Sequence, residues 1–239
     1  MALSVRDVIS LLRTPRVALG TTVNDQLALP LLVKLCRPRE VFLDVGAHIG
    51  SVIAEVQHQC PTAHIEAFEA IPEKAEKLRR RFPGVAIHSC ALSEDAGSVT
   101  FYVDTEESGY SSLAERPHGK KIVVSKCRLD SLVDRADLIK IDVEGAELGV
   151  LRGSDKLIER SRPTIMFESG PGNVLGYTKE AMFAWFAERN YGLFAPNRLA
   201  GTGGAMTLDG FLDSHEYPRR TTNYFALPIE KESEIRGRA

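Results

Sequence analysis

Acidic residues that close apolar, strand-like runs are the residues of this sequence best placed to do chemistry. The acids in question are Asp44, Glu69, Asp142, Glu144 and Glu168. Parallel strands end at one edge of a sheet, and α/β folds bind their ligands at that edge, so we expect these acids around one cleft. Carboxylates there could accept hydrogen bonds from sugar hydroxyls, share a proton with each other, or hold a cation.

The first run leads into a glycine turn. Val41–Val45 suits a strand covered on both faces, and Ser51–Gln59 can form a helix whose N-terminal N–H groups face the turn. Gly46 and Gly50 would let the backbone approach a ligand, because a Cβ would fill the space that the ligand needs. His48 lies inside this turn and has the intrinsic pKa of a base near neutrality, although a histidine so placed is more often a hydrogen-bonding wall.

The second run predicts a ribose site. His64–Glu69 alternates like a strand and ends in an acid 19 residues after Gly50. In a doubly wound sheet this strand lies beside the first, so Glu69 can accept hydrogen bonds from both ribose hydroxyls of a bound nucleoside. Ile71 would lie against the adenine, and Pro72 can start a helix that runs through Arg81. The alternative for Glu69 is a surface carboxylate beside the arginines at 79 to 81.

The third run carries three ionisable groups on one strand face. Residues 139 to 144 alternate, so Lys140, Asp142 and Glu144 share a face opposite the apolar residues. Burial of such groups is costly unless they are paired. We expect Lys140 to form a salt bridge that neutralises one acid, and we expect Asp142 and Glu144 to act at the ligand cleft.

Other segments complete an α/β domain. Residues 4 to 13 and a segment capped by Asn24 or Asp25 and ending at Leu35 read as helices that pack on the sheet edge and help to wall the cleft. Val85–Cys90 reads as a third strand, leading into Ala91, and residues 98 to 103 as part of a hairpin against the parallel sheet. Residues 104 to 120 form a long polar loop, either a lid or disordered.

The last third of the sequence predicts a strand that ends in Glu168, a helix and a final strand pair. The helix is Thr178–Asn190, whose aromatic stripe we interpret as core, and the final strands are Tyr191–Phe194 and Asn223–Leu227. We expect three divisions of the chain: an N-terminal helical cap (1–40), one catalytic domain (41–229) and a charged, disordered tail (230–239).

Composition excludes several function classes. The chain has 239 residues, 44% hydrophobic and 26% charged, with a net charge of -2. This charge gives no reason to expect nucleic acid or an anionic membrane as partner. No run approaches the length of a membrane span and the N-terminal segment does not look like a signal peptide, so we expect a cytoplasmic protein. The four cysteines form no Cys-x-x-Cys pair, which favours reduced thiols over zinc.

Four stretches together resemble the FkbM family of S-adenosylmethionine-dependent methyltransferases. They are Asp44–Gly50, Phe68–Pro72, Ser111–Leu113 and Ile139–Glu147, and the likeness spans residues 41 to about 227. The resemblance implies a Rossmann-like class I methyltransferase fold: a seven-stranded, mostly parallel sheet with helices on both faces and an antiparallel last strand. It also implies methyl transfer to an oxygen, often a hydroxyl of a sugar or polyketide. Ala70 stands where the familiar variant of the second motif has proline, which leaves Glu69 in place.

The same resemblance assigns roles within the motifs. Asp44, Gly46, Ala47 and Gly50 would form the cofactor turn, Glu69 would hold the ribose, and Asp142 and Glu144 would lie near the methionine end and the acceptor. We expect the S-adenosylmethionine contacts to include Asp44, Gly46, Ala47, His48, Gly50, Glu69, Ala70, Ile71, Ala91 and Asp142. Removal of the acceptor proton requires a base, and the candidates are Asp142, Glu144, Glu168 and His48. The acids could hold a divalent metal, but no ligand spacing requires one.

Two alternatives belong to other classes. A nicotinamide-dependent oxidoreductase also has a glycine turn and an acid after the second strand, but the turn here is Gly-x-x-x-Gly without the full dinucleotide pattern. A phosphate-binding P-loop is excluded because no lysine follows Gly50-Ser51. A non-catalytic nucleotide-binding or scaffold protein would keep the turn without needing acids at the cleft. The acceptor and the oligomeric state are left open by the sequence.

Overall fold

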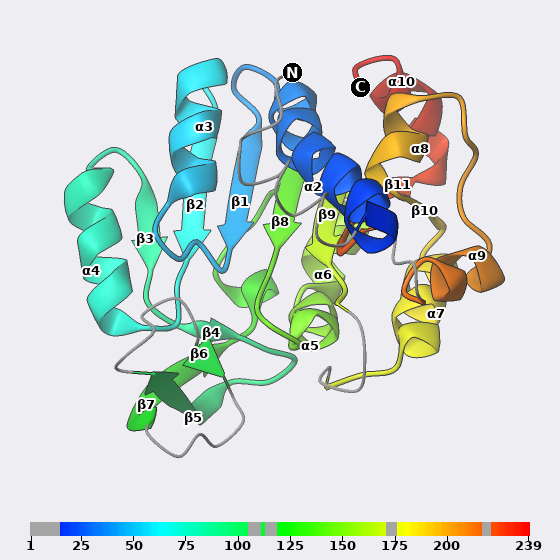
Figure 1. Ribbon diagram of the computed structural model, residues 1–239. Coiled ribbons are helices and arrows are strands. Elements are labelled where there is room, and N and C mark those ends of the chain that lie inside the picture. Colours follow the sequence, from blue (N-terminus) through cyan, green and yellow to red (C-terminus); the bar gives the residue numbers. More distant parts are fainter. Residues whose placement is uncertain (1–14, 105–110, 113–118, 171–175, 217–220) are drawn as a thin grey trace.

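A seven-stranded sheet forms the centre of the protein. The computed structural model describes residues 15–104, 111–112, 119–170, 176–216 and 221–239 (Figure 1). In this part of the chain the main sheet has the strand order β10-β11-β9-β8-β1-β2-β3. Its strands are β1 (Val41–Val45), β2 (His64–Phe68), β3 (Ala86–His88), β8 (Leu138–Ile141), β9 (Thr164–Glu168), β10 (Tyr191–Phe194) and β11 (Asn223–Pro228).

The strand directions confirm the predicted fold class. Parallel pairing joins β1 to β2 and β8, β2 to β3, and β8 to β9. The last strand, β11, lies antiparallel between β9 and β10. All strands of the parallel centre therefore end at the lower edge of the sheet in Figure 1. That edge is where the predicted acids were expected to meet.

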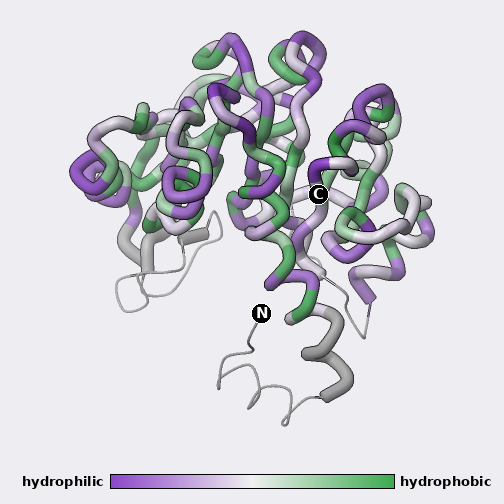
Figure 2. Tube along the Cα trace, turned by 90° about the horizontal axis from the view of Figure 1, so that it is seen from above, coloured by the Kyte–Doolittle hydropathy of each residue, from purple (hydrophilic) through white to green (hydrophobic). Residues whose placement is uncertain are grey.

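Two hydrophobic cores cover the two faces of the sheet. One core packs apolar residues of α2 (Pro15–Leu35), α3 (Ser51–Gln59), α4 (Pro72–Arg81), α8 (Pro196–Ala200) and α10 (Glu232–Arg236) against one face. The other core packs α5 (Glu147–Arg152), α6 (Asp155–Ser161), α7 (Lys179–Glu188) and α9 (Leu208–Asp213) against the opposite face. Figure 2 shows hydrophilic residues along the outer turns of the peripheral helices. Because apolar side chains fill both layers, the sheet is a rigid platform for its lower edge.

Helix α2 differs from its expected form and place. It begins at Pro15, so Asn24 and Asp25 lie inside the helix and do not cap it. Their side chains instead hold distant segments: the backbone N–H of Asn197 donates to Asn24 Oδ1 at 2.9 Å, and the Thr221 hydroxyl donates to Asp25 Oδ1 at 3.2 Å. Helix α2 packs on the sheet face within the same core as β1 and contacts α3, α8 and β11. It is therefore a layer of the fold, and its described residues do not wall the cavity described below.

A second, smaller sheet lies beyond the carboxyl edge of the first. It consists of β4 (Ala91–Leu92), β5 (Gly97–Asp104), β6 (Ser111–Ser112) and β7 (Gly119–Cys127), in the order β4-β7-β5-β6. The expected hairpin against the parallel sheet is therefore wrong, because β5 pairs antiparallel with β7, not with the main sheet. The pairing brings Val99 opposite the buried Val124, which turns the apolar side of this sheet inwards. This small sheet becomes one wall of the cavity.

The C-terminal segment is ordered, which corrects the expectation of a disordered tail. Residues 229 to 231 form a 3-10 turn and Glu232–Arg236 forms α10. The side chain of Ile235 is buried in the core with α2. The charges that suggested disorder are paired instead, Arg236 with Glu232 at 3.2 Å and Arg238 with Glu40 at 3.3 Å. One buried apolar side chain and these ion pairs hold the segment in place.

Most other element predictions are confirmed. Strand β9 and helices α3 and α4 have the expected bounds, and α7 is capped by Thr178, whose hydroxyl accepts from the Ala181 backbone N–H at 3.1 Å. Met182, Trp185 and Phe186 are buried, so this aromatic stripe is core. The helix expected at 4–13 and much of the loop expected at 104–120 lie outside the described residues.

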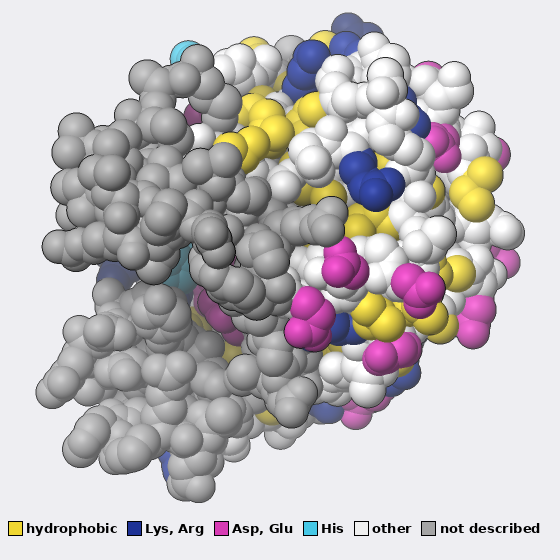
Figure 3. Space-filling view, turned by 45° about the vertical axis from the view of Figure 1, so that its right-hand side comes forward, with side chains coloured by type: hydrophobic (Ala, Val, Ile, Leu, Met, Phe, Trp, Pro, Cys, Tyr) yellow, Lys and Arg dark blue, Asp and Glu magenta, His cyan; other side chains and the backbone are white. Residues whose placement is uncertain are grey.

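Two surface observations complete the description. Among the described residues, no helix combines the length and the apolar character needed to cross a membrane. On the described part of the face in Figure 3, acidic and basic side chains lie interspersed among apolar ones.

Candidate active site

A cavity of about 680 Å³ opens at the carboxyl edge of the main sheet. Its walls come from the turn after β1, the ends of β2 and β8, the start of α4, and the small sheet. The lining side chains that matter most for the site are those of Ala47, His48, Glu69, Ala70, Ile71, Lys74, Ala91, Val99, Phe101, Asp142 and Glu144. Its size suits a nucleoside-containing ligand, because ligand sites commonly measure about 300–1,000 Å³.

The two glycines of the turn serve the protein's own packing. Gly46 and Gly50 both have φ +79°, a conformation that other residues adopt with strain. A Cβ on Gly46 would lie 1.8 Å from the backbone oxygen of Asp142, and a Cβ on Gly50 would lie 2.3 Å from the Phe82 ring. Gly46 also lines the cavity, whereas Gly50 lies beneath it. The expectation that ligand space required these glycines is therefore corrected: β8 and α4 occupy that space.

Glu69 is held in place by backbone N–H groups from two sides. The N–H of His48 donates to Oε2 at 2.9 Å, and the N–H of Ile71 donates to Oε1 at 2.9 Å. The residue is 7% exposed and lines the cavity. A carboxylate has about four lone-pair positions, so these two bonds fix its orientation and leave capacity for two hydroxyl donors. The alternative of a surface carboxylate beside the arginines at 79 to 81 is contradicted by this burial.

Lys140 lines the cavity and forms the predicted salt bridge, which links the residues of β1 and β8. Its Nζ lies 3.4 Å from a carboxylate oxygen of Asp44 and 3.4 Å from one of Asp142. It also donates to the carbonyl oxygen of Gly46 at 2.8 Å. Burial lowers the pKa of Lys140, but the two carboxylates outweigh burial and raise it. A charged Lys140 therefore links Asp44, buried below the turn, to Asp142 at the cavity.

Asp142 and Glu168 lie side by side at the ends of neighbouring parallel strands. Ile141 of β8 is in register with Phe167 of β9, and the two acids each follow by one residue. Burial, and next the Asp142 carboxylate, raise the pKa of Glu168 to about 9. The Glu144 and Glu147 carboxylates add to this rise. Two carboxyl groups this close tend to share one proton, which is a common arrangement for acid and base chemistry.

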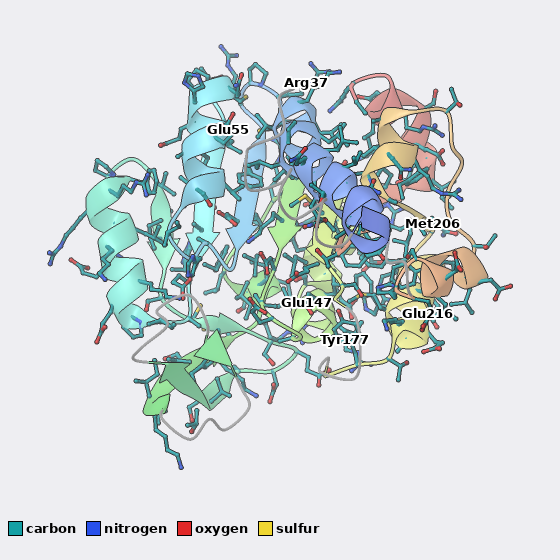
Figure 4. All side chains as sticks on the ribbon, viewed as in Figure 1. Arg37, Glu55, Glu147, Tyr177, Met206 and Glu216 are labelled. Atoms are coloured by element: carbon teal, nitrogen blue, oxygen red, sulfur yellow. The ribbon has the colours of Figure 1, made fainter. Side chains whose placement is uncertain are left out.

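A pair of residues that sequence reasoning missed fixes the loop carrying these acids. Glu147, 1% exposed, accepts from the backbone N–H groups of Val143 at 3.2 Å and Gly145 at 3.0 Å. Tyr177 donates its phenolic hydroxyl to the other oxygen of Glu147 at 3.0 Å, and Figure 4 shows the two side chains meeting near the lower edge of the sheet. The backbone N–H of Gly176 also donates to the carbonyl of Gly145 at 3.0 Å. We call this set of contacts the Glu147–Tyr177 latch.

The structure gathers most of the predicted residues, but not all, at the cavity wall. Ala47, His48, Ala70, Ile71, Ala91 and Glu144 line the cavity as expected. Asp44 is buried beneath the turn, and Glu168 lies behind Asp142 without lining the wall. Glu144 has φ 55°, so the strand alternation that predicted its direction does not extend past Asp142. The Nε2 atom of His48 is buried and has no hydrogen-bond partner among the described residues.

Several wall residues had no sequence signal strong enough to assign them. Lys74 on α4 and Lys126 on β7 are among them, together with the apolar Val99 and Phe101 of β5. Burial lowers the pKa of Lys74, and the Glu69 and Glu144 carboxylates oppose that change. Val99 and Phe101 were predicted only as part of a hairpin against the parallel sheet, and the sequence did not place them at the cavity. Among the described residues, no three His, Cys, Asp or Glu side chains converge as a metal site requires.

Comparisons with known proteins agree with this geometry. Residues 44–193 match the model of the methyltransferase FkbM domain. The chain is 31% identical over 157 residues to the 31-O-demethyl-FK506 methyltransferase FkbM of Streptomyces tacrolimicus, covering 49% of this chain and 60% of that protein. It is 31% identical over 155 residues to the methyltransferase sdnD of Sordaria araneosa, covering 48% and 60%. The matches thus span about 60% of the length of these curated relatives.

A solved structure shares the fold. The methyltransferase FkbM of Methylobacillus flagellatus KT superposes with a TM-score of 0.54 at 16% sequence identity. The superposition covers 80% of this chain and 44% of that protein. At this identity the likeness concerns the arrangement of helices and strands, and it agrees with the strand order of the main sheet.

Proposed function

The chain belongs to the FkbM family of methyltransferases, with S-adenosylmethionine as cofactor, and we propose that it methylates a hydroxyl oxygen of a sugar, glycan or polyketide-type small molecule. The observation that carries this proposal is the Asp142–Glu168 carboxyl pair at the cavity, since a hydroxyl acceptor must lose a proton. The name of the Streptomyces relative also supports it, because that name places the methyl group on the 31-O position of its acceptor.

The residues of the cavity fit the cofactor. The Glu69 carboxylate keeps lone pairs for two ribose hydroxyls while backbone N–H groups hold it. Ile71, Val99 and Phe101 give the same cavity apolar side chains for the adenine. The acids at the other end, Asp142 and Glu144, suit the positive charge of a sulfonium. We therefore assign the ribose to Glu69 and the methyl-donating end to the neighbourhood of Asp142.

The chain's own residues have two tasks in the reaction. The bound cofactor supplies an electrophilic methyl group, so the protein must align the acceptor oxygen and remove its proton. Asp142 lines the cavity, and its carboxylate lies 3.4 Å from Nζ of Lys140, so Asp142 is placed to accept the hydrogen bond of the acceptor hydroxyl. The proton of the hydroxyl then passes to the Asp142–Glu168 pair. His48 belongs to the ribose end, because its backbone N–H holds Glu69.

The oxidoreductase alternative is excluded by family membership, because the matched domain model describes methyltransferases. The scaffold alternative is tested by an assay of methyl transfer. Purified protein and methyl-labelled S-adenosylmethionine are incubated with a panel of hydroxylated glycans and polyketides, and label in the acceptor is measured. Methyl ethers are the expected product, whereas cofactor binding without label transfer to any hydroxyl would favour the scaffold.

Variants of the acid pair test the mechanism. Asp142→Asn and Glu168→Gln keep size while removing the base, so kcat should fall by about 100- to 10,000-fold. Cofactor affinity should change far less, by a few-fold. The matched control is Glu188→Gln, whose carboxylate lies on α7 and is exposed. Unchanged kcat in both acid variants would contradict the assignment of the base.

A further inference from the structure

The Asp142–Glu168 pair lies at the acidic end of the cavity, where the proposed function places the positively charged sulfonium of the cofactor. The two acids extend β8 and β9 by one residue each, beyond the register pair Ile141 and Phe167. Neighbouring strands lie about 4.8 Å apart, and partners in parallel register project to the same face. The carboxyl groups are therefore close enough to repel each other strongly if both are ionised.

The surrounding charges do not relieve this repulsion. From the loop after β8 and from α5, Glu168 faces Asp142, Glu144 and Glu147, all acids. From the other side β11 contributes Asn223, a neutral amide in register with Glu168.

Two further groups complete the surroundings of the pair. The Tyr177 phenol is occupied as a donor to Glu147. The ammonium of Lys140 is shared, at 3.4 Å from oxygens of both Asp44 and Asp142. Among the described residues, negative charge thus exceeds positive charge around the pair, so we expect the pair to retain a proton at neutral pH, in agreement with the raised pKa of Glu168.

We propose that binding of S-adenosylmethionine expels this proton from the Asp142–Glu168 pair to solvent, whereas binding of S-adenosylhomocysteine does not. The step is balanced: one carboxyl O–H bond breaks, the proton goes to bulk buffer, and the carboxylate charge is compensated by the sulfonium charge. The product cofactor has a neutral thioether in place of the sulfonium, so it does not compensate the negative charge that the pair would gain by losing its proton. This inference rests on the proposed function, in which the methyl-donating end lies beside Asp142.

As a consequence, binding of the methyl donor would convert the acid pair into its basic, ionised form. The pair becomes fully ionised when the methyl donor is present, and it regains a proton once the sulfonium charge has been lost. Affinity for S-adenosylmethionine must then rise with pH, by at most tenfold per pH unit for one proton, while affinity for S-adenosylhomocysteine stays nearly constant. The enzyme would discriminate between substrate and product cofactor by charge, and the discrimination would grow as the pH increases.

The test is titration calorimetry on the full chain with both cofactors. At pH 7.5, titrations in phosphate and in Tris, buffers with very different ionisation enthalpies, report the protons exchanged on binding. We expect roughly one proton released with S-adenosylmethionine and close to none with S-adenosylhomocysteine. Between pH 6.5 and 8.5, the Kd for S-adenosylmethionine should decrease several-fold per pH unit. Glu168→Gln should abolish the release and retain binding, and Glu188→Gln on α7 should behave as wild type.

Every outcome bears on the proposal. Equal proton release with both cofactors, or release that survives Glu168→Gln, would overturn it. If Glu168→Gln does not fold, Asp142→Asn provides the second variant, and the wild-type comparison of the two cofactors stands by itself. Absence of S-adenosylmethionine binding would contradict the cofactor assignment as well. Selective proton release without methyl transfer to any hydroxyl would instead contradict the proposed acceptor class and leave this inference standing.

Discussion

The two ends of the cavity are constructed in opposite ways. At the end proposed to bind the ribose, the polar group is satisfied by the protein itself, since Glu69 accepts backbone N–H bonds from His48 and Ile71. At the end proposed for the reaction, Asp142 and Glu168 lie on adjacent strands and would carry like charge if both were ionised. The ribose end is thus organised before any ligand arrives, whereas the reacting end is held in an electrostatically unfavourable arrangement.

The two ends therefore affect the stability of the folded protein differently. A satisfied carboxylate orients a ligand at little cost, whereas crowded acids destabilise the folded protein and are tolerated where their proton chemistry is needed. The packed strands and the Glu147–Tyr177 latch oppose that destabilisation at the reacting end. Gly46 packs against the backbone of Asp142, and we call this contact the junction of the two ends. Substitutions at the junction, in the acid pair and in the latch should therefore have separable effects.

The junction should give the largest effect. Gly46→Ala would place a Cβ 1.8 Å from the Asp142 backbone oxygen and would strain a residue at φ +79°. We expect the free energy of unfolding to fall by about 3 kcal/mol or more, measured by urea denaturation. The matched control is Gly149→Ala in α5, where a Cβ would meet nothing within 4 Å, and it should be neutral or stabilising by up to about 1 kcal/mol. Equal stability of the two variants would contradict the close contact between the ends.

The acid pair should give a smaller effect of opposite sign. Because the pKa of Glu168 is raised to about 9, the folded protein binds more protons than the unfolded chain between about pH 4.5 and 9. Stability contributed at this position is therefore lost as pH rises through that window.

Glu168→Gln removes this loss. The difference in free energy of unfolding between the variant and the wild type should be more favourable to the variant at pH 8 than at pH 4.5, by on the order of 2 kcal/mol, or roughly 5 °C in Tm. Thermal melts at both pH values measure the difference, and a variant that is equally destabilised at pH 4.5 and pH 8 would show that the acid is not under strain.

The latch should give the smallest effect on stability and a selective effect on activity. Tyr177→Phe removes the hydroxyl that donates to Glu147, so the free energy of unfolding should fall by about 1–1.5 kcal/mol. Tyr191→Phe is the matched control, because its buried hydroxyl donates to the Pro163 carbonyl at 3.0 Å away from the cavity. Both variants should lose similar stability in chemical denaturation, but Tyr177→Phe alone should lower kcat several-fold. Equal kcat in the two would assign the latch a merely structural role.

The sequence predicted the position of Glu69 at the cavity because the determinants of that position are local. The strand Val41–Val45, the glycine turn and the acid at Glu69 follow one another within about one strand-helix-strand unit, and their spacing carries the geometry. Lys140 was also predictable, because a lysine in a buried strand must find acids. The main sheet followed from the same kind of local pattern.

The rest depended on contacts between distant segments. Tyr177 meets Glu147 across 30 residues of chain, and β5 pairs with β7 instead of the main sheet. The residues of β5 were predicted as part of a hairpin, but local pattern does not specify which sheet such a hairpin joins. The C-terminal helix was missed for a similar reason, because its charges are compensated by partners such as Glu40 that are remote in sequence.

We propose that the cavity binds S-adenosylmethionine through Glu69 as a preformed ribose acceptor, and the affinity for the cofactor tests this proposal. Calorimetric titration of wild type and Glu69→Ala with S-adenosylmethionine, with NAD as the competing ligand, should show binding that weakens by about 10- to 100-fold in the variant, since two hydrogen bonds to a charged group are lost. NAD should not compete. Equal affinity of both proteins for S-adenosylmethionine, or binding of NAD alone, would contradict the claim.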